Sequence, residues 1–364
     1  MSNRAALVAV LTAFAVGLLA SLSLRPASPA ARTSAQSGAL PSIRWRLPSA
    51  FGTNLPALGD NVVEVSERVR AASGGRFDIE VFEPGEVVPA FDIVNAVRDG
   101  KVQAGYTWLG YDQGKLPASV LFGAVPFGMR PWEYAAWWYE GGGSALALDI
   151  YGRYGVRPIL CGLIGPETAG WFRVGIETPE DLAGLKIRFA GLGGKAMQRL
   201  GASVTMLPGS EIFQALERGA IDATEFSLPV VDARLGFDRV ARINYFPGWH
   251  QPFTAFHLVV AQNEWARLDT QARATLESAC TAGVIRNLAR AEAIQGPVLA
   301  EMGDRGVEAR SLPPAILEAL AEASAEVLAE EAAADADFAR VLAAQRAFSA
   351  DYSRWQDIAY PRIR

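Results

Sequence analysis

The sequence predicts an α/β fold of two similar lobes with a cleft between them. Short runs of Ile, Phe, Val and Thr alternate with helical stretches, which is typical of parallel sheets because parallel strands need crossover connections. Asp92–Tyr106 and Glu211–Glu225 align without a gap, each as a helix, a glycine and a strand. Their offset of about 119 residues is longer than a solenoid repeat. We therefore interpret them as parts of two lobes, and a chance recurrence of the helix–glycine–strand unit is the alternative.

Length and composition agree with two ordinary domains. The chain has 364 residues, of which half are hydrophobic and a fifth are charged. Its net charge of −5 and its lack of basic runs exclude a nucleic-acid-binding class, which needs clustered Lys and Arg. Cys161 and Cys280 are the two cysteines, so a disulfide framework and a thiolate zinc site are excluded. One bond between them is compatible with the sequence, which does not determine the pairing.

The amino terminus has the pattern of a secretory signal. Arg4 precedes the apolar, charge-free stretch Ala5–Leu24, and small residues follow. We expect a signal peptide at residues 1–30, cut after Ala30, and a linker at residues 31–42. Because about 20 apolar residues can span a bilayer, an uncleaved anchor is the alternative.

The first lobe begins at Ile43. We expect strands at 43–47, 77–82 and 101–108 and helices at 57–72 and 90–98. Tyr106 and Trp108 lie at the end of the last of these strands, where aromatic side chains form either core or cleft wall. A tryptophan-rich helix starts at about Pro131, and we expect its Trp132, Trp137, Trp138 and Tyr139 to be buried.

The second lobe contains the charged candidates. Glu167 lies in a Gly/Pro loop, Arg188 in the strand 185–189, and Glu225 at the end of the next strand but one. Ligands bind at the carboxyl ends of the strands in open α/β sheets, so Arg188 and Glu225 are candidates for one site. Further along we expect a helix at 228–237, strands at 243–246, 253–261 and 307–312, one long helix at 269–302, and helices at 313–334 and 337–355.

Two observations bear on catalysis. Residues 191–196 fit the G-x-G-x-x-A pattern of a dinucleotide-binding loop. However, Glu211 opens a helix, whereas a ribose-binding acid should end the second strand, and no Ser or Thr follows Lys195 as a P-loop requires. The sequence has neither HExxH nor GxSxG, and it shows no obvious pair of nucleophile and base. A binding protein is favoured over an enzyme.

Several short motifs occur together in one order and spacing. They are Ala124–Gly128, Gly141–Gly143, Gly170–Arg173, Thr178–Leu182, Gly184–Arg188, Ala215–Glu225 and Tyr245–Trp249. In these motifs the chain resembles the solute-binding proteins of tripartite ATP-independent periplasmic (TRAP) transporters, most closely the branch that binds 2-oxo acids. The resemblance covers almost everything after about residue 43. It implies a two-lobe periplasmic-binding-protein fold with an inter-lobe cleft and extra C-terminal helices.

The resemblance also implies roles for individual residues. Arg188 matches the arginine that pairs with the ligand carboxylate, with Tyr106 and Trp108 as further ligand-binding candidates. Glu225 matches a side-chain metal ligand, and Phe226 matches a position that gives its backbone carbonyl, where the branch typically has Trp. Glu167 stands where the branch has glutamine.

The exchange has a counterpart, because Gln251 stands where the branch has glutamate. The count of carboxylates is thereby kept, and we expect Glu167 and Gln251 to remain metal ligands, with Glu167 and Glu225 also facing the substrate. The two glutamates and a ligand carboxylate outweigh Arg188 by about two negative charges, which favours a cation, either sodium or calcium.

The resemblance implies a periplasmic receptor that delivers a small 2-oxo or 2-hydroxy carboxylate to membrane permease subunits. We expect lobe I to comprise residues 43–164 and about 246–290, and lobe II to comprise 165–245 and about 291–330. The C-terminal helix at 331–364 is a candidate dimerisation element, and its apolar stripe must pack on its own domains or on a partner. The alternatives are an NAD(P)-dependent oxidoreductase that uses the Gly191 loop and a ligand sensor that partners a signalling receptor.

Overall fold

The strands of this chain fall into three sheets, and the computed structural model describes residues 42–359. The predicted signal peptide at 1–30, all but the last residue of the linker at 31–42, and the end of the C-terminal segment at 360–364 lie outside the described residues. Within 42–359, every helix is too short or too polar to cross a bilayer.

The first two sheets belong to one half of the chain. β1 (Ile43–Pro48) pairs in parallel with β2 (Phe77–Phe82), and an isolated bridge between Ser49 and Tyr106 links this pair to the second sheet. That sheet has the order β3 (Ala104–Trp108), β10 (Thr254–Ala261), β4 (Val156–Ile164). The helices of this half are α2 (Gly59–Ala72), α3 (Ile93–Arg98), α4 (Pro131–Tyr139), α5 (Gly143–Arg153), α9 (Gln262–Arg267) and α10 (Thr270–Ala293).

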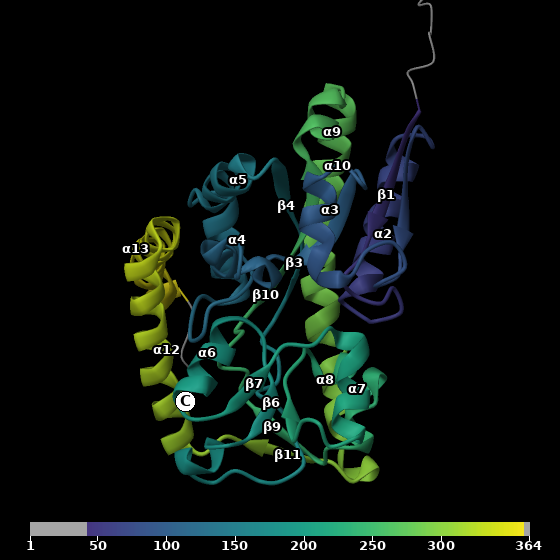
Figure 1. The fold of residues 1–364 in the computed structure, drawn as a ribbon. Coiled ribbons are helices and arrows are strands. Elements are labelled where there is room, and N and C mark those ends of the chain that lie inside the picture. The colour runs from purple at the N-terminus through teal and green to yellow at the C-terminus, as the bar shows by residue number, and fades with distance from the viewer. Residues whose placement is uncertain (1–41, 360–364) are drawn as a thin grey trace, which may run out of the picture. The chain divides into compact units, whose positions relative to one another are not determined.

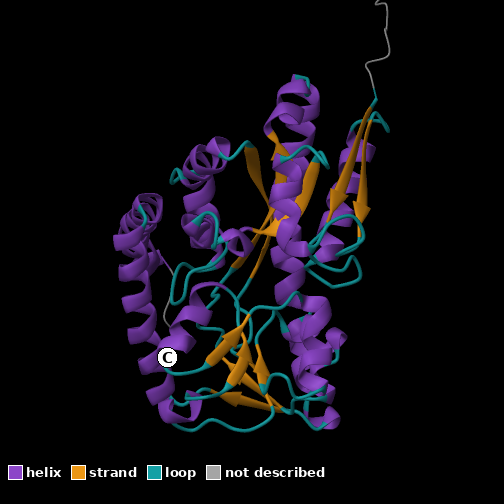
Figure 2. Cartoon of the chain, in the orientation of Figure 1, coloured by secondary structure: helices purple, strands orange, loops and turns teal. Residues whose placement is uncertain are grey.

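The third sheet has six strands and builds the other half, shown in orange in the lower part of Figure 2. Its strand order is β11 (Glu308–Ser311), β9 (Ile243–Phe246), β5 (Gly170–Phe172), β8 (Ala223–Thr224), β6 (Lys186–Arg188), β7 (Ser203–Thr205). Its helices are α6 (Gly191–Arg199), α7 (Gly209–Glu217), α8 (Pro229–Leu235), α11 (Gln295–Glu301) and α12 (Pro314–Ala334). We keep lobe I and lobe II as names for the predicted ranges of the two halves.

The expectation of parallel sheets holds only in part. β6 pairs in parallel with β7 and β8, but β5 runs antiparallel to both of its neighbours, and β10 runs antiparallel to β3 and β4. The cause is the route of the chain. It leaves the first half after β4 and returns to it through β10. β5 and β10, the strands by which the chain enters each half from the other, therefore run antiparallel to their neighbours.

The expected long helix at 269–302 is two helices. α10 ends at Ala293, and α11 runs from Gln295 to Glu301. Pro297 explains the break, because proline has no N–H to donate to the carbonyl four residues earlier and its ring clashes with that carbonyl. The tryptophan-rich helix α4 begins at Pro131 as expected, but Trp132 and Tyr139 are exposed while Trp137 and Trp138 are buried.

The two C-terminal helices pack on different halves of the same chain. α12 lies against α6, and α13 (Ala336–Ala359) packs against α4, α5 and the short helix Pro117–Phe122 (Figure 1). Phe338, Val341 and Leu342 of α13 are buried there. This part of the predicted apolar stripe therefore packs on the protein's own domains.

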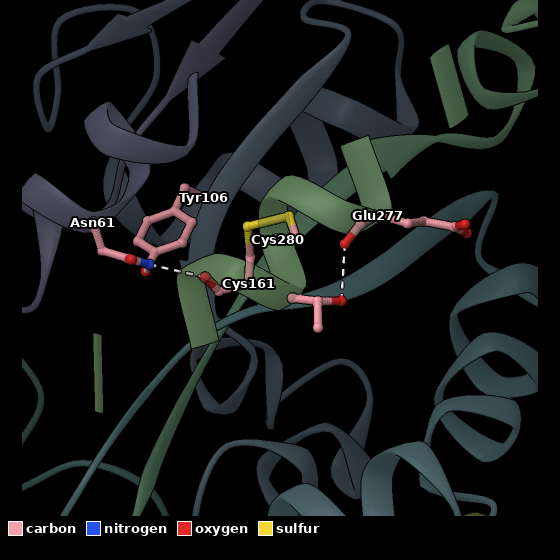
Figure 3. Close-up of a disulfide and its surroundings, with 6 residues drawn as sticks. Asn61, Tyr106, Cys161, Glu277 and Cys280 are labelled. Atoms are coloured by element: carbon pink, nitrogen blue, oxygen red, sulfur yellow. Dashed lines mark hydrogen bonds between the residues drawn. A yellow bond between two sulfur atoms is a disulfide. The ribbon is translucent and has the colours of Figure 1, made fainter. Parts of the chain in front are cut away.

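A disulfide joins Cys161 of β4 to Cys280 of α10 (Figure 3). Both residues are fully buried, and Asn61 of α2 donates one hydrogen bond to the Cys161 carbonyl (2.9 Å) and lies 3.0 Å from the Tyr106 hydroxyl. The bond crosslinks segments that are 119 residues apart in sequence, and it fixes α10 against the sheet that it covers.

Candidate ligand and cation site

Arg188 is the most constrained charged residue of the site. It lies at the end of β6 with only 1% of its surface exposed. Its Nε donates to the carbonyl of Leu207 (3.1 Å), and its Nη1 donates to the carbonyl of Glu225 (2.8 Å). Nη1 also lies 2.9 Å from the Glu225 Oε2 atom. These contacts fix the plane of the guanidinium group, which is the geometry that recognises a carboxylate.

Glu225 follows β8, the strand beside β6. Because Arg188 is in register with Thr224, the two charged side chains emerge from the same end of neighbouring parallel strands, as the sequence predicts. Glu225 is fully buried, and its Oε1 accepts a hydrogen bond from the backbone N–H of Ala190 at 2.5 Å. Its Oε2 faces Arg188 but has no aligned hydrogen-bond donor.

Glu167 comes from the connection between β4 and β5 and is also buried. Its backbone N–H donates to the carbonyl of Gln251 (3.2 Å). The Thr254 hydroxyl lies 2.8 Å from Glu167 Oε1 and 2.9 Å from Gln251 Oε1. The structure thus places the two exchanged residues, Glu167 and Gln251, side by side. Burial raises the pKa of Glu167 to about 8, although the Thr254 hydroxyl and Arg188 oppose that rise.

His250 completes the group, and no sequence pattern predicts a role for it in the site. Its ring is 1% exposed, and Nε2 lies 3.6 Å from Glu167 Oε2 and 4.0 Å from Glu225 Oε2. Burial lowers the pKa of His250 to about 4, so the imidazole is neutral at pH 7. No spaced metal motif marks this residue. Its position directly before Gln251, a predicted ligand, was the available signal.

With the exception of His250, these groups line a small cavity of about 20 Å³, which has room for about one water molecule. This volume is well below the range for ligand pockets, so a bound carboxylate requires the walls of the cavity to move apart. The lining residues are Phe51, Leu58, Trp108, Tyr111, Glu167, Arg188, Ala190, Glu225, Phe226, Ser227, Gln251, Thr254 and Phe256. The cavity therefore takes its walls from both lobe I and lobe II.

Some of the aromatic candidates line this cavity and one does not. Trp108 and Phe226 line it, and the Arg188 guanidinium lies 5.4 Å from the centre of the Phe226 ring. Tyr106 is fully buried beside Asn61 and is not among the lining residues. Tyr111 lines the cavity instead, just beyond the end of β3. Burial raises the pKa of Tyr111 to about 12, and Arg188 opposes this rise.

The donor set fits a cation. Glu167 Oε2 is a buried carboxylate oxygen without a hydrogen-bond partner in the described chain, and Glu225 Oε2 has the ion-pair contact with Arg188 in place of a hydrogen bond. Such buried groups are costly unless they are compensated. Gln251 adds an amide oxygen beside them. Oxygen donors of this kind suit sodium or calcium. Phe226 borders the same cavity, as its predicted role as a carbonyl ligand requires.

The glycine loop that resembles a dinucleotide site has a different environment. Gly191 opens α6 with a positive φ of 62°, and a Cβ atom there would lie 2.9 Å from the indole ring of Trp108. The ring of a lobe I residue therefore packs on the loop where a pyrophosphate would need to approach the backbone.

Two α/β halves that both line a small cavity containing buried charged groups define a solute-binding protein. The chain belongs to the family described as bacterial extracellular solute-binding protein, family 7, whose model matches residues 53–335. This assignment confirms the predicted resemblance to TRAP solute-binding proteins and places the chain in an extracytoplasmic class of receptors.

Individual relatives agree with this assignment. The chain is 35% identical to a monocarboxylate 2-oxoacid-binding periplasmic protein of Nostoc sp., over 90% of this chain and 89% of that protein. A TRAP solute-binding protein of Pseudoalteromonas atlantica, solved with sodium and pyruvate, is 33% identical with a TM-score of 0.84, over 87% of this chain and 97% of that one.

Two further solved structures are similar. A protein from Colwellia psychrerythraea with bound calcium and pyruvate is 33% identical with a TM-score of 0.83, over 87% of this chain and 97% of that one. A dimeric protein from Bordetella bronchiseptica with calcium and picolinate is 29% identical with a TM-score of 0.86, over 88% of this chain and 95% of that one. The two-lobe fold class predicted from the sequence is confirmed by these neighbours.

Proposed function

We propose that this protein is the periplasmic receptor of a TRAP transporter for a small 2-oxo or 2-hydroxy carboxylate such as pyruvate. In this proposal it binds the acid together with sodium or calcium and delivers it to the membrane permease subunits. The observation that carries the proposal is the buried guanidinium of Arg188, which two backbone carbonyls orient beside a small cavity.

The residues of the cavity divide the work of recognition. Arg188 pairs with the ligand carboxylate, and charge-assisted bonds of this kind contribute about 1.5–3 kcal/mol each. Glu167, Glu225, Gln251 and the carbonyl of Phe226 would hold the cation, whose charge offsets the two carboxylates when it is bound. Trp108 and Phe226 are walls of the cavity and exclude water from the carboxylate. Tyr106 is proposed to act indirectly, through the strand that also carries Trp108.

Calorimetry tests this proposal. Purified protein is titrated with pyruvate, lactate and longer 2-oxo acids in calcium, in sodium, and in a chelator without sodium. We expect micromolar or tighter binding of at least one acid that depends on the cation. We expect Arg188→Ala to abolish binding while circular dichroism shows a folded chain. Arg354→Ala removes an arginine whose side chain is 82% exposed, and this control should bind like the wild type. Failure of the wild type to bind any such acid contradicts the proposal.

The protein is proposed to act by binding and not by redox chemistry, because Trp108 packs on the Gly191 loop. Nicotinamide nucleotides should leave the intrinsic fluorescence of its nine tryptophans unchanged up to millimolar concentration. A saturable change at micromolar concentration would instead support the oxidoreductase alternative. A ligand sensor would have the same cavity, and capture of the permease subunits by the loaded receptor separates transport from sensing.

We also infer that two copies associate through the end of α13. Trp355 and Ile358 are 61% and 82% exposed there, which is unusual for large apolar side chains near each other on one helix. The similar Bordetella bronchiseptica protein was solved as a dimer. Light scattering should give twice the mass of one chain, and Trp355→Glu with Ile358→Glu should give a monomer that still binds ligand. A monomeric wild type at micromolar concentration contradicts the inference.

A further inference from the structure

His250 is a buried imidazole without a role in the function proposed above. Neither ring nitrogen has a hydrogen-bond partner in the described chain. The ring is held between Phe189 and Trp249, whose ring centres lie 4.7 and 5.5 Å away. Buried polar groups normally have partners, and an exception calls for an explanation such as an ion. The carboxylate oxygens that face Nε2 are Glu167 Oε2, which has no hydrogen-bond partner in the described chain, and Glu225 Oε2, which is in an ion pair with Arg188.

The distances distinguish a hydrogen bond from shared coordination. Nε2 lies 3.6 Å from Glu167 Oε2 and 4.0 Å from Glu225 Oε2, beyond the roughly 3.2 Å limit of an N–H···O hydrogen bond. Two donors on bonds of about 2.1 Å to one ion lie about 3.4 Å apart at a tetrahedral angle and at most about 4.2 Å apart. The three donor atoms lie within 4.8 Å of one another, so small side-chain shifts bring them onto one ion.

The chemistry of these donors selects a class of cation. Sodium and calcium take oxygen ligands, whereas an imidazole nitrogen with two carboxylates suits zinc and related first-row divalent ions. A divalent ion also balances the charge, because the two glutamates and a bound carboxylate exceed Arg188 by two negative charges. Sodium would leave one of these charges uncompensated.

We propose that His250 is a ligand of the cleft cation together with Glu167 and Glu225, so that the site binds a first-row divalent ion such as Zn²⁺ more tightly than Ca²⁺. This inference rests on the cation site of the proposed function, but it can fail independently of that function. It adds a nitrogen donor and a class of metal to the oxygen ligands named above.

Nuclear magnetic resonance gives a direct test, because the chain contains only two histidines. Tag-free protein labelled with ¹⁵N-histidine is titrated with ZnCl₂ and, separately, with CaCl₂. We expect Zn²⁺ to shift the imidazole nitrogen signals of one histidine by far more than Ca²⁺ does, and His250→Gln should remove those signals. His257 is the matched internal control, since it is equally buried but packs against Trp138, with no carboxylate paired to it.

Calorimetry supplies the second measurement. We expect wild-type protein to bind Zn²⁺ at least tenfold more tightly than Ca²⁺, and His250→Gln to lose at least tenfold in Zn²⁺ affinity while its Ca²⁺ affinity changes less than threefold. His257→Gln should leave both affinities unchanged. Unchanged His250 signals at saturating Zn²⁺ overturn the proposal even when pyruvate and calcium bind. Zn²⁺ coordination by a protein that binds no 2-oxo acid contradicts only the proposed transport function.

Discussion

Arg188 and Glu225 form a buried ion pair whose surroundings decide whether it stabilises the fold. Both side chains are almost fully withdrawn from solvent, so their desolvation offsets much of their mutual attraction. Backbone groups compensate part of this cost, since two carbonyls accept from Arg188 and the Ala190 N–H donates to Glu225. Truncating one partner leaves an uncompensated charge, which costs about 3–5 kcal/mol. Arg188→Ala therefore needs a measurement of folding beside its measurement of binding.

Glu167 should make cation binding depend on pH. Burial raises its pKa from 4.5 to about 8 in the ligand-free protein, so below that pH the carboxyl group is mostly protonated and a cation must displace the proton. Calcium affinity should therefore rise between pH 6 and pH 8 and become constant above pH 9. Glu167→Gln should bind calcium at least tenfold more weakly at pH 8 and lose this rise. Calorimetry at four pH values checks both effects, and a wild-type affinity independent of pH contradicts the assignment.

The same raised pKa has an opposite consequence for the stability of the cation-free fold. Between pH 4.5 and about 8 the folded chain holds a proton on Glu167 that the unfolded chain has released. Stability therefore falls as the pH rises through this window. Chemical denaturation in chelator should show the loss for the wild type and a smaller loss for Glu167→Gln. Equal slopes for the two proteins would falsify the linkage.

Sequence could locate some residues of this site for a geometric reason. Arg188 and Glu225 end neighbouring parallel strands, so the strand pattern alone brings them together. Glu167 and Gln251 were found only through the resemblance, because both lie in connections whose path depends on the packing of the two halves. His250 was missed because an isolated histidine in a turn has no spacing pattern. Tyr111 clusters with Tyr106 and Trp108 at the end of β3, and the sequence leaves open which of these aromatic side chains face the cavity.

At the scale of elements, the site depends on two connections that touch. The segment before β5 carries Glu167, and the segment between β9 and β10 carries Gly248 to Gln251. A Cβ atom on Gly248 would lie 2.1 Å from the backbone oxygen of Glu167. A side chain therefore cannot be added at Gly248 unless the Glu167 backbone moves. This contact sets how far the carboxylate projects toward the cavity.

Gly248→Ala should thus impair both stability and binding. Overpacking of this kind costs about 1–3 kcal/mol, and we expect calcium and pyruvate affinity to fall at least tenfold. Gly114→Ala is the matched control, because Gly114 is exposed and a Cβ atom there has no neighbour within 4 Å. Denaturant unfolding and calorimetry on both variants check the prediction. Wild-type binding by Gly248→Ala would show that the two connections move independently.

Local pattern predicted the elements better than their connections and contacts. β2 and β9 have the predicted bounds, and α4 begins at Pro131, because alternation and a first-turn proline are local signals. The break at Ile294 was missed although Pro297 marks it. The exposure of Trp132 was missed because the five aromatic residues of this nine-residue helix cannot all face one side, and their pattern does not say which faces of the helix are covered.

At the scale of the whole molecule, two devices hold distant parts of the chain together. α12 and α13 carry the chain from the second half back to the first. There Asp149 and Arg153 of α5 form exposed ion pairs with Arg340 and Asp337 of α13. The disulfide closes a loop between Cys161 and Cys280. Its pairing could not be read from the sequence, because the contact between β4 and α10 exists only after tertiary packing.

Removing the disulfide should lower stability without a matching loss of function. Closing a loop of about 100 residues contributes on the order of 4–5 kcal/mol in the chain-entropy model, and for a chain of this size that corresponds to roughly 8–20 °C in melting temperature. Cys161 and Cys280 are buried in lobe I and do not line the ligand cavity. We therefore expect Cys161→Ala with Cys280→Ala to melt earlier, while its affinity for pyruvate changes less than threefold. Calorimetric scanning and ligand titration measure the two effects.

Treatment of the wild type with reductant should reproduce the lower melting temperature and should leave the double variant unchanged. An equal melting temperature for oxidised and reduced protein would mean that packing between α10 and β4 alone supplies the stability of that half.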